Sequence, residues 1–71
     1  MRPQDIKLGE SYRHHTDPKY GYAKAVRILK PHQAPNTHSY AIVECEWTIR
    51  KNDSFGMIKY FRPCDLLEEP A

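Results

Sequence analysis

The segment YAIVECEWTIR, residues 40–50, constrains the fold more than any other part of the sequence. Its apolar residues recur at every second position and include β-branched side chains and a tryptophan. This alternation is typical of a strand with one buried face, so we predict a half-buried strand here. The face predicted for the core carries Ala41, Val43, Cys45, Trp47 and Ile49. The face predicted for water carries Ile42, Glu44, Glu46, Thr48 and Arg50.

A hairpin and a terminal turn are predicted after this strand. The turn formers KNDS, residues 51–54, lead into FGMIKYF, residues 55–61, which predicts a second strand after a loop of about four residues. Pro63 ends this strand because proline has no N–H to donate to a sheet ladder. The following CDLL has room for one short helical turn, which would pack Leu66 or Leu67 over the core.

The segment AKAVRILK, residues 23–30, fits two structures. Gly21 and Pro31 limit it to a length that is short for a helix but ordinary for a strand, so a strand is the prediction. Its alanine, lysine and leucine content and the helical spacing of its apolar residues keep a helix as the alternative. The stretch LGESYRH, residues 8–14, adds a short first strand, and KPHQAPNTHS, residues 30–39, forms a long polar loop.

This order of short strands and loops predicts an all-β fold. We expect a small SH3-like barrel, or a strongly bent antiparallel sheet of about four or five strands, with a short terminal helical turn. We expect residues 1–71 to form one domain, with an ordered core over about residues 6–67 and an acidic tail at residues 68–71.

The layout resembles that of the SH3-like barrels found in Tudor and KOW-type modules. More loosely, the chain resembles a small bacterial family of unknown function, which opens with a glycine and a Tyr-Arg-His stretch and closes with an Arg-Pro pair before a hydrophobic residue. The matching stretches are GESYRHH, residues 9–15, and FRPCDLL, residues 61–67. The resemblance implies a compact β-rich fold in a bacterial or phage-like protein, and it implies no established activity.

The composition is that of a folded chain without a membrane span. Hydrophobic residues make up 39% of it, and no low-complexity tract is present. The longest apolar run is far below the roughly 20 residues of a membrane span. Asp5, Lys7 and Glu10 interrupt the region where a signal peptide would lie. We therefore expect a cytoplasmic protein in which Cys45 and Cys64 stay reduced.

The sequence lacks the spacings of known catalytic and metal-binding motifs. No nucleophile elbow, phosphate-binding glycine loop or HExxH helix is present, so we predict that the protein is not an enzyme and uses no cofactor. Neither cysteine has a CxxC partner, and His14 and His15, as neighbours on a strand, are expected to point to opposite faces. We therefore predict no metal site, and a loop site shared by His15, His32 and His38 is the remaining alternative.

Positive charge is concentrated in the middle of the chain. The formal net charge is only +2, but no acidic residue lies between Asp17 and Glu44. That interval holds Lys19, Lys24, Arg27 and Lys30. A basic stripe of this kind is the electrostatic footprint of a protein that binds a polyanion. A solvated face rich in lysine is the alternative interpretation.

Eight aromatic residues, one Trp, five Tyr and two Phe, exceed what so small a core needs. Aromatic residues interleaved with cations can stack on bases beside bound phosphates, or they can line a groove for a peptide. We predict a non-catalytic binding module with nucleic acid as its ligand; docking on a larger partner protein is the alternative. The contact residues predicted for this module are Tyr20, Tyr22, Lys24, Arg27, Lys59, Phe61 and Arg62. A third interpretation is that the tyrosines only cover the open ends of the barrel.

Overall fold

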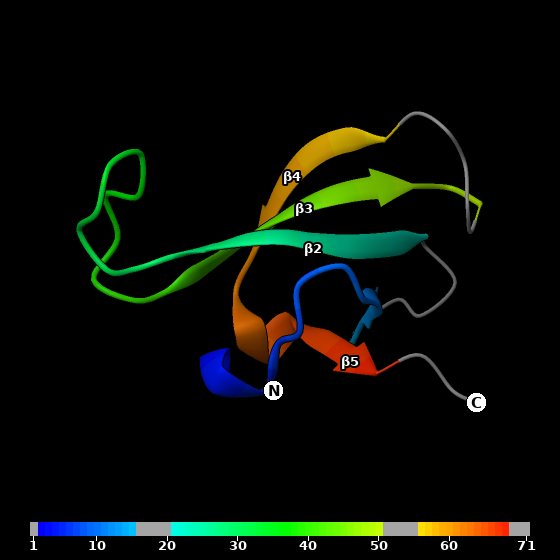
Figure 1. Ribbon diagram of the computed structural model, residues 1–71, viewed down its shortest axis with the longest axis horizontal. Coiled ribbons are helices and arrows are strands. Elements are labelled where there is room, and N and C mark those ends of the chain that lie inside the picture. The colour runs from blue at the N-terminus through cyan, green and yellow to red at the C-terminus, as the bar shows by residue number, and fades with distance from the viewer. Residues whose placement is uncertain (1, 16–20, 51–55, 69–71) are drawn as a thin grey trace.

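Five antiparallel strands form one open sheet in a computed structural model of the chain, which describes residues 2–15, 21–50 and 56–68 (Figure 1). The strands are β1 (Ser11–His14), β2 (Tyr22–Leu29), β3 (Ile42–Thr48), β4 (Met57–Phe61) and β5 (Leu66–Glu68). They lie in the order β4-β3-β2-β1-β5, so the last strand pairs with the first. The predicted all-β fold class is therefore confirmed.

Helical structure in the described residues is limited to two short 3-10 turns. They are η1 (Pro3–Asp5) and η2 (Pro63–Asp65). None of the described helical elements has the length or apolar character needed to cross a membrane.

Strand β2 connects the two halves of the sheet, pairing with β3 on one side and with β1 on the other (Figure 1). A β-bulge at Val26 interrupts its pairing, because Ala25 lies opposite Cys45 and Arg27 lies opposite Glu44. Because of this extra residue, odd-numbered residues of β2 face the core before the bulge, and even-numbered residues face it after the bulge. This change explains why the apolar spacing of the segment also fits a helix, although the predicted strand is correct.

The core lies on one face of the sheet, which we call the core face. Its buried residues are Ile6, Tyr12, Ala23, Ala25, Val43, Cys45 and Leu66, with Ile28, Trp47 and Phe61 packed against them. The buried hydroxyl of Tyr12 is satisfied because it accepts a hydrogen bond of 2.8 Å from the backbone N–H of Lys7. The opposite side of the sheet, here called the outer face, carries the residues that alternate with these.

Trp47 lies on the core face with Val43 and Cys45, as predicted, but it is half-buried rather than largely buried. The Nζ atom of Lys59 lies 4.5 Å from the centre of its ring. Gly21 packs against the ring on another side. A Cβ atom there would lie 2.7 Å from the indole and 2.6 Å from the carbonyl oxygen of Thr48. Only glycine fits this close approach.

The two ends of β3 depart from the predicted alternation. Ile49, assigned to the core face, follows the last residue of the strand and is 71% exposed. Ile42, assigned to water, is 7% exposed because it packs with Leu29 on the outer face, where the loop of residues 30–41 covers both. The predicted hairpin pairing of β3 with β4 is confirmed, whereas its turn at residues 51–54 lies outside the described residues.

The C-terminal segment folds differently from the prediction in one respect. Strand β4 ends before Pro63, as expected, but the helical turn is η2 itself and it precedes both leucines. Leu66 is fully buried and begins β5, opposite His14 of β1, while Leu67 is 44% exposed. The leucines therefore belong to a fifth strand, and only the first of them enters the core.

Candidate functional site

The predicted contact residues divide between the two faces of the sheet. Tyr22, Lys24 and Arg27 lie on the outer face of β2. Lys59 and Phe61 lie on the core face, because they pair with the buried Cys45 and Val43. Arg62 follows β4 at the start of η2, and Tyr20 lies outside the described residues. The described members of the set thus do not form one continuous surface.

An acidic partner holds Arg27 on the outer face. Its Nη2 atom lies 2.9 Å from Oε1 of Glu44, and the hydroxyl of Tyr60 donates to the same oxygen at 3.3 Å. The hydrogen bond to Glu44 and the charge of that carboxylate raise the pKa of Arg27 above its ordinary value. The guanidinium remains charged, but much of its attraction for a phosphate is already directed to Glu44.

Arg62 is paired in the same way, with Asp65 three residues further on. Its Nε atom lies 3.1 Å from Oδ2 of Asp65 and its Nη2 atom 3.4 Å from Oδ1. On the outer face, Lys24 of β2 lies opposite Glu46 of β3. Two residues of the basic stripe, Lys24 and Arg27, therefore lie beside carboxylates of β3.

Arg13 was not singled out from the sequence, yet it shares the outer face with two predicted residues. Its guanidinium carbon lies 4.2 Å from the centre of the Tyr22 ring, a cation–π contact between β1 and β2. Lys24 follows Tyr22 at the next outer position of β2. No local sequence signal identifies Arg13, because its approach to Tyr22 depends on the register of two strands.

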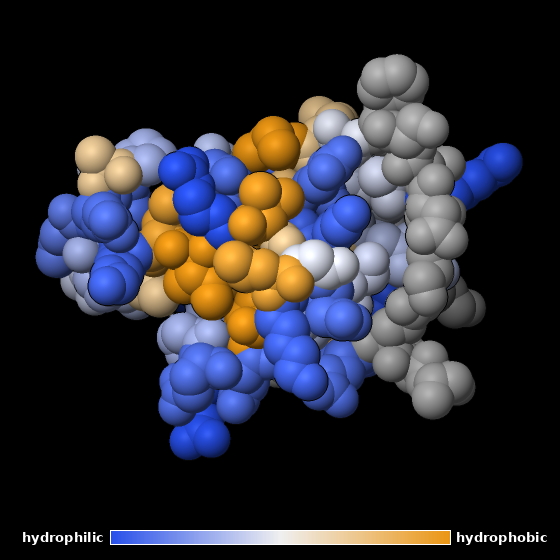
Figure 2. All heavy atoms as spheres, viewed as in Figure 1, coloured by the Kyte–Doolittle hydropathy of each residue, from blue (hydrophilic) through white to orange (hydrophobic). Residues whose placement is uncertain are grey.

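The edge strand β4 exposes large apolar and aromatic side chains. Met57 is 63% exposed, Ile58 55% and Tyr60 54%, and among the described strands β4 pairs with β3 alone. On the face drawn in Figure 2, apolar side chains gather in the middle of the molecule beside the long loop. Lys59 interrupts the apolar run of β4, but it lies over Trp47 on the core face.

A groove of about 260 Å³ lies where β4 meets the loop of residues 30–41 on the outer face. It is lined by Leu29, Pro35, Asn36, Thr37, His38, Ile42 and Tyr60. Tyr60 contributes one wall from β4, and apolar side chains of β2 and β3 contribute the floor. The exposed edge strand and the groove are therefore parts of one surface.

Asn36 fixes the loop that forms the other wall. It is 5% exposed, and its side-chain N–H groups donate to the carbonyl oxygens of Lys30 at 2.9 Å and Tyr40 at 3.0 Å. Its side-chain oxygen accepts from the backbone N–H of His38 at 3.0 Å. One buried amide thus ties both ends of the loop together. Sequence reasoning missed this role, because an asparagine in a polar loop does not stand out.

Three potential metal ligands gather at the other end of the sheet. The donor atoms of His14, His15 and Asp65 all lie within 4.8 Å of one another. The expectation that His14 and His15 point to opposite faces is therefore wrong, because β1 ends at His14 and the two histidines do not alternate along a strand. His32 and His38, the other members of the predicted loop alternative, do not belong to this cluster of described residues.

Comparison with known proteins assigns the chain to no family. No family model, no curated protein and no solved structure matches this chain. The resemblance to the small bacterial family consequently rests on its short motifs alone.

Proposed function

We propose that the protein is a cytoplasmic, non-catalytic binding module that docks on a partner protein by accepting an extended segment along β4. The observation that carries this proposal is the exposure of Met57, Ile58 and Tyr60 on a strand at the edge of the sheet. The outward N–H and C=O groups of an edge strand can pair with an added strand. Two free cysteines fit a reducing compartment.

The side chains of β4 indicate what the partner presents. Ile58 and Tyr60 point to the outer face, and the groove bounded by Tyr60 continues this surface over Leu29 and Ile42. An added strand would place every second side chain above the same face. The fitting partner is therefore an extended segment with apolar residues at alternate positions, one of which enters the groove.

The fold we propose for this module is an SH3-like barrel. The order β4-β3-β2-β1-β5 supports it, since the last strand returns to the first. The 3-10 turn η2 directly before β5 supports it as well. In this arrangement β4 keeps one edge open, which is the edge that the proposed partner would use.

Selection from a displayed library of random linear peptides tests the docking surface. We expect enriched peptides with alternating apolar residues, whose binding shifts the backbone amide signals of residues 57–61 in NMR spectra. Ile58→Glu should abolish this binding. Leu67→Glu is the matched control, because Leu67 is also an exposed apolar residue, on the opposite edge strand. Peptides that bind both variants equally would contradict the proposal.

Nucleic acid is the second candidate ligand, and one observation favours it. Arg13 lies over the ring of Tyr22 on the outer face, and Lys24 occupies the next outer position of β2. Cations combined with an aromatic ring can contact phosphates and stack on bases. The carboxylates of Glu44 and Glu46 on the same face oppose the approach of a polyanion. For this reason protein docking is the better-supported function.

Fluorescence titration with single- and double-stranded DNA and RNA decides between the candidates. Binding through phosphate contacts should weaken steeply with salt, and replacing Arg13 and Lys24 by glutamine should weaken it across unrelated sequences. Ile58→Ala, which adds no charge to the outer face, should leave it unchanged. No binding to any of the four nucleic acids at low salt would remove this second candidate.

A further inference from the structure

The end of β1 and the start of β5 bring three side chains with metal-binding atoms together. His14 is the last residue of β1, His15 follows it, and Asp65 is the last residue of η2. His14 pairs with Leu66, and the backbone N–H of His15 donates to the carbonyl oxygen of Asp65 at 2.9 Å. The sheet therefore fixes the backbones that carry these side chains.

We propose that His14, His15 and Asp65 bind a divalent transition-metal ion of the Zn²⁺, Co²⁺ or Ni²⁺ type. Their donor atoms lie within 4.8 Å of one another, and Nδ1 of His15 lies 3.6 Å from Oδ1 of Asp65. Ligands of a tetrahedral zinc ion are separated by about 3.3 Å, given bonds of about 2.0 Å. Side-chain rotations that bring the atoms up to about 1.5 Å closer are enough to complete three bonds.

The ligand types decide which ions fit. Imidazole nitrogens suit zinc, nickel and copper, whereas calcium and magnesium prefer sites made of oxygen atoms. Two imidazoles and one carboxylate leave at least one coordination position for water or another donor. The His15 side chain is 43% exposed, so solvent reaches this open position.

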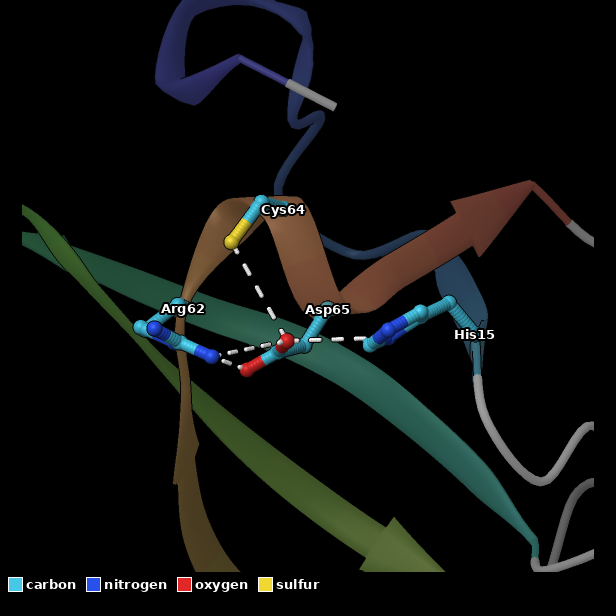
Figure 3. Close-up of polar contacts among 4 residues, drawn as sticks. All are labelled: His15, Arg62, Cys64 and Asp65. Carbon is cyan, nitrogen blue, oxygen red and sulfur yellow. Dashed lines mark hydrogen bonds and ion pairs between the residues drawn. The ribbon is translucent and has the colours of Figure 1, made fainter.

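Arg62 competes for the same carboxylate, as Figure 3 shows. Its guanidinium contacts both oxygens of Asp65, and its side chain is 55% exposed. A metal ion has to displace this cation, which can swing into solvent. Charge repulsion and the lost ion pair lower the affinity of the site, so removal of Arg62 is expected to strengthen metal binding.

Cys64 lies beside Asp65, outside the group of three mutually close ligands. Its sulfur lies 4.0 Å from Oδ1 of Asp65, and its side chain is exposed (Figure 3). A thiolate is a strong ligand for zinc and cobalt. The geometry thus offers Cys64 as a fourth donor after rotation of its side chain, although the three-residue site does not depend on it.

Titration of the purified protein with Zn²⁺ in a calorimeter, and with Co²⁺ in a visible spectrometer, tests the site at neutral pH. We expect one ion per chain and a higher melting temperature in its presence, because only the folded chain holds the three ligands together. Loss of one ligand, in His15→Ala or Asp65→Asn, should weaken binding at least about tenfold. Arg62→Gln should tighten it.

The histidines of the β2–β3 loop supply the matched control. The double variant His32→Ala/His38→Ala removes two imidazoles away from the cluster and should bind the metal like the parent chain. If Asp65→Asn fails to fold, His15→Ala and Arg62→Gln still move affinity in opposite directions. Absence of saturable binding of Zn²⁺ and Co²⁺ would overturn the proposal, as would equal binding by His15→Ala and the control. If Cys64→Ser alters the visible spectrum of the bound cobalt ion, the thiolate of Cys64 is a further ligand.

Discussion

The two cysteine thiols have opposite surroundings. Cys45 is fully buried in the core, whereas Cys64 is exposed beside η2. Burial, with a smaller contribution from the charge of Glu44, raises the pKa of the Cys45 thiol to about 12. Since the thiolate is the reactive form, we expect a disulfide reagent at pH 8 to label one thiol quickly in the folded protein and two in denaturant. Rapid labelling of both thiols without denaturant would contradict the buried position of Cys45.

A second prediction at this scale concerns Gly21. A methyl group there would meet the indole of Trp47 and the carbonyl oxygen of Thr48 at less than contact distance. We expect Gly21→Ala to lower the free energy of unfolding by about 1–3 kcal/mol through overpacking. Gly9→Ala is the control, since Gly9 also has a positive φ of 89° but no atom lies near its absent Cβ. Urea unfolding of both variants measures the free energy of unfolding and separates crowding from backbone strain. An equal loss of free energy in the two variants would contradict the crowding explanation.

At the scale of the element, β5 shows how a three-residue strand is stabilised by one side chain. Leu66 is fully buried, whereas Leu67 beside it is 44% exposed. Leu66→Ala should cost about 2–5 kcal/mol through the cavity it leaves, and Leu67→Ala should change stability by less than about 0.5 kcal/mol. Thermal melting of the two variants measures the difference. Similar melting temperatures would show that β5 is not held by Leu66.

The elements that could be predicted from the sequence are those with a long local pattern. Alternation predicts the strand over residues 40–50, the turn formers after it predict its hairpin partner, and the residues that bound it predict β2. Strand β5 was not predicted, because a strand of three residues is too short to show an alternating pattern. The burial of Ile42 was missed because it depends on a loop that Asn36 folds over the outer face.

The candidate surfaces could be predicted less well than the strands, for a physical reason. The sequence shows that Lys59 and Arg62 are basic, but only the strand register shows that one lies over Trp47 and the other is held by Asp65. The same holds for His14 and His15, whose proximity to Asp65 depends on the pairing of β1 with β5. Contacts between distant segments determine a binding site on a sheet, and local patterns do not contain them.

At the scale of the whole molecule, the pairing of the first and last strands makes the fold depend on its C-terminal segment. Removal of residues 66–71 deletes β5, leaves Tyr12 and His14 without their ladder partners, and takes Leu66 out of the core. A domain of this size has only about 5 kcal/mol of stability to lose, so we expect this truncated chain to be unfolded at room temperature.

Removal of residues 68–71 alone is the matched truncation. It keeps Leu66 and Leu67 with their partners on β1, and among the described residues it removes the pairing of Glu68 with Tyr12 at the end of the ladder. The melting temperature should then fall by a few degrees, about the effect of 1 kcal/mol or less. If the longer truncation melted like the full chain, β5 would be dispensable and the edge of β1 would be open. The sheet would then offer a second site for strand addition, in competition with β4.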